Sequence, residues 1–66
     1  MSIAKVIEIN ASSPVSFDDA VKKGIAKVGE TVNNLQGAWV QEQKVVINGQ
    51  NIVEYRVNLK VTFLVD

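Results

Sequence analysis

The chain has 66 residues, seven lysines and arginines against seven aspartates and glutamates, and neither cysteine nor histidine. A chain this short has room for one domain, expected over residues 1–66, and it buries only about 60% of its unfolded surface, so it is marginal alone. The composition excludes disulfides, Cys/His zinc sites and the commonest general base. Zero net charge argues against nucleic-acid binding. We therefore expect self-association to supply the missing stability.

The first half of the chain predicts a strand followed by a helix. Residues 3–9 are rich in β-branched side chains and predict a strand, and residues 10–14 (Asn-Ala-Ser-Ser-Pro) predict a turn. Ser16 is a good N-cap for a helix over roughly residues 17–33, because apolar residues recur there at helical spacing. Gly24 and Gly29 are costly inside a helix, which suggests a close approach to a sheet or to a neighbouring subunit. The apolar face comprises Phe17, Ala20, Val21, Ile25, Val28 and Val32, and the charged residues opposite it are expected to face solvent.

The second half predicts a β-hairpin. Strands are expected over residues 38–47 and 52–65, joined by an Asn-Gly-Gln-Asn turn at 48–51. The second strand alternates, with Val53, Tyr55, Val57, Leu59, Val61, Phe63 and Val65 on one face. The chain is therefore expected to be an α+β protein of β-α-β-β order, with a three-stranded antiparallel sheet in order 1-3-2 partly wrapped around one helix. The last strand would be about 46 Å long, whereas a compact chain of this size is about 28 Å across.

A candidate binding surface follows from pairing the hairpin around its turn. The expected pairs on the face away from the helix are Trp39–Lys60, Gln41–Asn58 and Gln43–Arg56. A large ring beside amides and cations suits a planar anionic ligand, whose phosphate or carboxylate would meet Arg56. The interpretation of Trp39 as the anchor of a subunit interface is the stronger of the two on the sequence alone, and both roles can coexist at a shared interface.

Several segments together resemble one family, the dodecins, over essentially the whole chain. They are residues 3–9, Ser12-Ser13-Pro14, residues 30–34, Ala38-Trp39-Val40 and residues 54–63. The resemblance implies a homododecamer forming a hollow sphere, with storage rather than turnover as its function. It also implies flavin as a possible cofactor, whether FMN, riboflavin or FAD, stacked by Trp side chains between subunits. Some branches of the family bind calcium or magnesium, but no dense carboxylate cluster in this sequence marks a metal site.

The sequence departs from the family pattern at two positions. Gly37 stands where the stacking Trp is usual, and Trp39 follows two residues later on the same strand face. Arg56 follows Tyr55 where flavin-binding members carry Gln. The expected cofactor-binding residues are Trp39, Gln41, Gln43, Arg56 and Gly37, with no catalytic residues. The alternative function is a structural or interaction oligomer, open to cation binding, that has lost flavin. No apolar run has the length of a signal peptide or a membrane span, so a cytoplasmic protein without membrane partners is expected.

Overall fold

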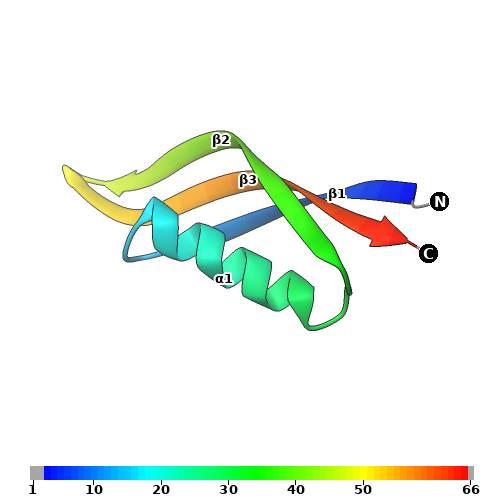
Figure 1. The fold of residues 1–66 in the computed structure, drawn as a ribbon. Coiled ribbons are helices and arrows are strands. Elements are labelled where there is room, and N and C mark those ends of the chain that lie inside the picture. The colour runs from blue at the N-terminus through cyan, green and yellow to red at the C-terminus, as the bar shows by residue number, and fades with distance from the viewer. Residues whose placement is uncertain (1–2, 66) are drawn as a thin grey trace.

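The computed structural model describes residues 3–65 and contains one helix and three strands (Figure 1). Their order is β1 (Ile3–Ser13), α1 (Phe17–Gly29), β2 (Leu35–Asn48) and β3 (Asn51–Val65). The strands form one antiparallel sheet in order β1-β3-β2, and α1 packs on one of its faces. The predicted β-α-β-β order and the predicted 1-3-2 sheet are confirmed. The expected domain also includes Met1, Ser2 and Asp66, which lie outside the described residues.

β1 is longer than predicted. Asn10–Ser13 were expected to belong to a turn, but they continue the strand, with Asn10 opposite Asn58 and Ser13 opposite Tyr55. The turn prediction was wrong there because β3 extends far enough to pair with all 11 residues of β1. The backbone hydrogen bonds of that pairing outweigh the local turn preference of Asn and Ser.

The helix is shorter than predicted, ending at Gly29 instead of near residue 33. The backbone N–H groups of Thr31 and Val32 both donate to the carbonyl of Val28, which closes the last turn. Asn34 then takes a left-handed conformation, with φ of 64°, and directs the chain into β2. Glycine and β-branched residues are weak helix formers, so the local sequence does not favour further helical turns beyond this point. Within residues 3–65, α1 is the only helix and has 13 residues. It is not long and apolar enough to cross a membrane.

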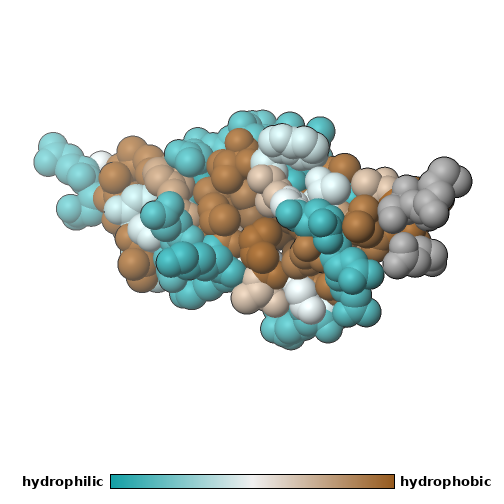
Figure 2. All heavy atoms as spheres, viewed as in Figure 1, coloured by the Kyte–Doolittle hydropathy of each residue, from teal (hydrophilic) through white to brown (hydrophobic). Residues whose placement is uncertain are grey.

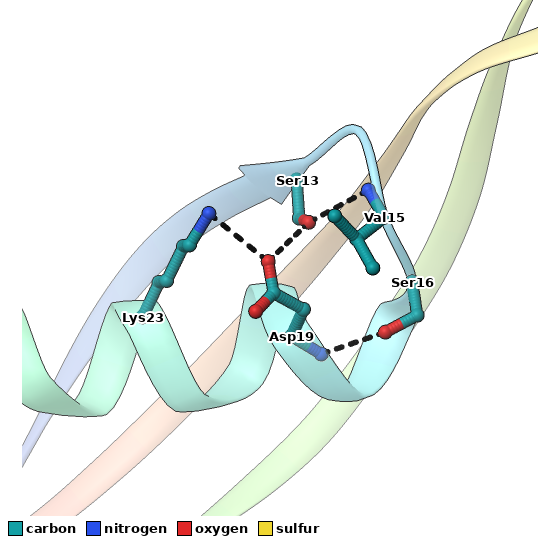
Figure 3. A network of polar contacts seen from close by, with 5 residues as sticks. All are labelled: Ser13, Val15, Ser16, Asp19 and Lys23. Atoms are coloured by element: carbon teal, nitrogen blue, oxygen red, sulfur yellow. Dashed lines mark hydrogen bonds and ion pairs between the residues drawn. The ribbon is translucent and has the colours of Figure 1, made fainter.

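The start of α1 is tied to the end of β1 by a polar network (Figure 3). Ser16 is the N-cap, as predicted, and its Oγ accepts a hydrogen bond of 3.0 Å from the Asp19 N–H. The buried Ser13 hydroxyl accepts from the Val15 N–H at 2.9 Å and donates to Asp19 Oδ2. Lys23 Nζ lies 3.0 Å from the same oxygen. The hydrogen bond from Ser13, followed by that from Lys23, holds the pKa of Asp19 below its ordinary value.

The core lies between the middle of α1 and the middle of β3. Val57, Leu59 and Val61 are almost completely buried there, together with Ala20 from the helix. Gly24 lets the helix come close: a Cβ added at this position would lie 3.0 Å from the Ala11 Cβ and 3.4 Å from Leu59 Cδ1. The prediction of a close approach to the sheet is confirmed at Gly24.

The molecule is much longer than it is wide, with extents of 52 × 19 × 13 Å and a radius of gyration of 13.6 Å. A compact chain of this length would have a radius of gyration of about 11 Å. The hairpin therefore overshoots its own core, as its predicted length implied. Large apolar side chains are exposed at its tip, including Ile47 and Ile52, and at the start of β1, including Ile3. Figure 2 shows brown, apolar atoms at several places on the visible surface.

The close packing at Gly24 gives a matched test. Gly24→Ala should lower the free energy of unfolding by about 1–2 kcal/mol, because overpacking costs more than the gain in helix propensity. The Ala11 Cβ belongs to a paired strand and cannot rotate away. Gly29→Ala is the control, because its Cβ would meet Leu35 Cδ1 at 3.7 Å, an ordinary contact. We expect it to be neutral or stabilising by up to about 1 kcal/mol. Urea unfolding measures both variants, and equal effects would contradict the packing argument.

The lowered pKa of Asp19 predicts a dependence of stability on pH. A carboxylate whose folded pKa lies below its unfolded value of 3.8 contributes stability above that pH. This contribution is lost as the pH falls through the folded pKa. Asp19→Asn should therefore be less stable than the wild type at pH 7 and should lose less stability on acidification below about pH 4. Parallel wild-type and variant curves of urea midpoint against pH would contradict this role.

Candidate ligand-binding face of the sheet

The face of the sheet opposite α1, here called the open face, carries three rows of polar and aromatic side chains. Because Val57, Leu59 and Val61 point to the helix, the alternate residues of β3 point the other way. The pairing of β3 with both neighbours extends each of these residues into a row across three strands. The aromatic row is Glu8–Lys60–Trp39, the amide row is Asn10–Asn58–Glu42, and the cation row is Ser12–Arg56–Lys44.

A β-bulge in β2 decides which of its residues reach the open face. Trp39 lies opposite Lys60, as predicted. The register then shifts between Val40 and Glu42, so Gln41 has no residue opposite it and Gln43 lies opposite Val57. The predicted pairs of Gln41 with Asn58 and of Gln43 with Arg56 are therefore wrong. Counted from the turn, an extra residue in β3, Val53, first displaces the pairing by one residue, and the extra residue Gln41 in β2 then restores it. Gln43 lies between these two shifts, so it faces the helix side of the sheet.

Between the two shifts, two residues lie on the open face that the sequence analysis missed. Glu42 lies opposite Asn58, and Lys44 lies opposite Arg56. On the other side of β3, Asn10 and Ser12 were missed because they had been assigned to a turn. Two extra residues, Gln41 in β2 and Val53 in β3, separate the predicted from the observed pairs of the hairpin, and no glycine or turn signal marks either of them in the sequence.

A groove of about 490 Å³ runs over the amide and cation rows. Asn58 Nδ2 donates a hydrogen bond of 3.2 Å to Asn10 Oδ1, whereas the buried Oδ1 of Asn58 finds no donor among the described residues. Arg56 Nε donates to Glu54 Oε1 at 2.5 Å, which leaves the terminal amino groups of the guanidinium available. The groove therefore offers an acceptor on Asn58 without a donor among the described residues, cationic donors on Lys44 and Arg56, and the carboxylate of Glu42.

Trp39 does not line this groove; it lies in the adjacent row, opposite Lys60, with 61% of its surface exposed. Gly37 lies opposite Thr62 on the same face, which confirms that positions 37 and 39 share a strand face. A Cβ added at Gly37 would meet nothing within 4 Å, so there is open space on the sheet beside the indole ring. An exposed indole next to open space can stack on a planar molecule.

The open face is less suited to a metal ion. Calcium and magnesium require several oxygen ligands, usually including carboxylates. Within residues 3–65, no group of three or more acidic side chains gathers in space. The described part of one chain thus supplies no carboxylate cage.

Comparison with known proteins agrees with this fold. The family model described as Dodecin matches residues 3–66. A calcium dodecin of Mycobacterium tuberculosis is 32% identical over 63 residues, covering 96% of this chain and 89% of its own. Its crystal structure, described as having a novel calcium-binding site, superposes with a TM-score of 0.83 at 30% identity, covering 92% of this chain and 87% of that one. The dodecin of Streptomyces davaonensis superposes with a TM-score of 0.93 at 31% identity, covering 98% and 96% of the two chains.

The order β-α-β-β, with the last strand in the middle of the sheet and one face left uncovered by the helix, defines a class of very small α+β subunits. Within this class, the match over nearly the whole chain is specific. The chain belongs to the dodecin family, as the sequence resemblance predicted.

Proposed function

We propose that this protein is a homo-oligomeric binding and storage protein that sequesters flavin, or a related planar anionic ligand, at the interfaces between its subunits. The observation that carries the proposal is the position of Trp39, a largely exposed ring in the row next to a polar groove that is lined by Arg56, Glu42 and Asn58. Gly37 leaves the space beside the ring open. Membership of the dodecin family supports a binding role over turnover. Cytoplasmic location stays a prediction.

The composition of the core supports assembly. Among the described residues, the fully buried apolar side chains are Ala20, Val57, Leu59 and Val61, whereas eight large apolar side chains are exposed. This core is small for a chain of 66 residues. Closed symmetric assembly is the ordinary way to cover such surface, and the family resemblance favours twelve copies.

The oligomer can be tested directly by its mass in solution. We expect a single species of about twelve times the 7.2 kDa chain mass by light scattering at micromolar concentration. Ile52→Asp, at the exposed hairpin tip, should shift the protein toward smaller species, because a buried unpaired carboxylate is costly. Lys22→Asp, on the exposed side of α1, is the control. A stable wild-type monomer would refute the assembly.

The ligand can be tested by titration with riboflavin, FMN and FAD, followed by quenching of flavin fluorescence. Trp39→Ala should weaken binding at least tenfold, since stacking contributes about 0.5–1.5 kcal/mol and burial of the ring about 2 kcal/mol. A tenfold change requires only about 1.4 kcal/mol. Val15→Ala, in an exposed loop, is the control. Unchanged affinity in an intact Trp39→Ala oligomer would place the ligand elsewhere.

A second candidate is a structural or cation-binding oligomer without flavin. It is favoured by Gly37 and Arg56, which replace the usual stacking ring and amide, and by the relative described as a calcium dodecin. In this case Trp39→Ala lowers the dissociation temperature of the oligomer, no flavin is quenched, and calcium raises that temperature. Gly37→Trp separates the two functions further, because the open space at this position accepts a ring. Tighter riboflavin binding by Gly37→Trp than by the wild type would show that this face can hold a flavin.

A further inference from the structure

We infer that the Asn48–Gly49 peptide at the hairpin tip is a site of spontaneous modification, where the side-chain amide of Asn48 is lost as ammonia and replaced by a carboxylate. The product lies beside apolar side chains that the proposed oligomer buries, so a modified chain is excluded from assembly. The exclusion rests on the proposed function, whereas the modification depends only on the chemistry of the turn.

The reaction is an attack within the chain followed by hydrolysis. The backbone nitrogen of Gly49, after losing its proton to a base, attacks Cγ of Asn48, which is held next to it in the chain. The new N–Cγ bond closes a succinimide ring, the bond from Cγ to Nδ2 breaks, and Nδ2 takes up a proton and leaves as ammonia. Water then adds to one of the ring carbonyls and opens the ring. The product is aspartate or isoaspartate, in which the main chain runs through the former side chain.

The first observation is the freedom of the attacking nitrogen. The last pair of the hairpin joins Asn48 to Asn51, so Gly49 lies in the loop beyond the ladder. Among residues 3–65, its N–H donates none of the backbone hydrogen bonds found outside the helix and the strands. A Cβ added at Gly49 would meet nothing within 4 Å, and glycine has no side chain of its own to shield the nitrogen. The nitrogen is therefore open both to a base and to Cγ of Asn48.

The second observation separates Asn48 from the other asparagines, because it is the only one followed by glycine. Asn10 and Asn58 hold each other, since Asn58 Nδ2 donates to Asn10 Oδ1 at 3.2 Å. The side chain of Asn48 takes part in none of the side-chain hydrogen bonds found within residues 3–65. Asn51 is also exposed, but the β-branched Ile52 that follows it shields the attacking nitrogen. Asn51 is thus a control within the same turn.

The third observation is the surface on which the product lies. Residues 47–53 form an unbroken exposed run, in which Ile47 and Ile52 have 60% and 50% of their surface exposed. A new aspartate is ionised at neutral pH, and burial of an unpaired carboxylate is costly. Isoaspartate also lengthens the main chain by a carbon, which disturbs the pair between Asn48 and Asn51. A chain is therefore modified while its tip is exposed, and it then joins the oligomer poorly.

The modification is tested by incubating the wild-type protein at mildly alkaline pH. The chain has zero net charge, so the product gains a negative charge and separates by ion exchange. Cleavage after Lys44 and Arg56 releases residues 45–56, whose fragment masses distinguish conversion at Asn48 from conversion at Asn51. We expect conversion at Asn48 to be at least about tenfold faster. Equal conversion at both residues would overturn the site. So would an unchanged Asn48 in the protein when most of a synthetic peptide of residues 45–56 has reacted.

The exclusion is tested by light scattering on the purified acidic form and on Asn48→Asp. Both should shift toward smaller species. Asn48→Ser is the matched control, because it removes the reacting amide without adding a charge; it should assemble like the wild type and yield no acidic form. Full assembly of the acidic form and of Asn48→Asp would overturn the exclusion. A monomeric wild type would refute the proposed oligomer and the exclusion together, whereas conversion at Asn48 would still decide the modification site.

Discussion

β3 runs for 15 residues through the middle of the sheet, whereas α1 above it has 13 residues, and this mismatch in length controls the rest of the structure. A strand rises about 3.3 Å per residue and a helix about 1.5 Å, so β3 extends for about 50 Å under a helix of about 20 Å. The helix covers only the middle of the strand, where Val57, Leu59 and Val61 are buried. Towards the hairpin tip the strand exposes apolar residues such as Val53, which no described residue of this chain covers and which the proposed assembly would bury.

Much of the fold could be predicted because its signals are local. The Asn-Gly turn fixed the hairpin, and Gly49 takes the positive φ of 67° that such a turn requires. The alternation along β3 and the helical spacing in α1 identified the two surfaces that meet in the core. The extent of β1 could not be predicted, because Asn10–Ser13 become a strand only through pairing with β3. The same residues, alone in water, favour a turn.

The candidate site was predicted less well than the fold, and two register shifts in the hairpin explain why. Trp39 lies opposite Lys60 as expected, because the extra residue Val53 in β3 and the extra residue Gln41 in β2 cancel each other before Trp39 is reached from the turn. Gln43 lies between the two shifts, so it faces the other side of the sheet and Lys44 lies opposite Arg56 in its place. A displacement by one residue thus changed the chemistry of the groove from a second amide to a second cation. A register error of one residue changes little in a predicted fold, but it exchanges the side chains that the affected strand segment places on the two faces of the sheet.

The open face also connects ligand binding to assembly. One chain can stack on only one side of a planar ring, since Trp39 is the only tryptophan of the sequence and lies on β2, an edge strand of the sheet. In the proposed oligomer, a neighbouring chain covers the second side, so a ligand at this position contacts two subunits at once. A ligand that binds the assembled state and not the separate chains stabilises assembly by about 2.7 kcal/mol at a hundred times its Kd. Occupancy of the groove and stability of the oligomer are therefore expected to rise together.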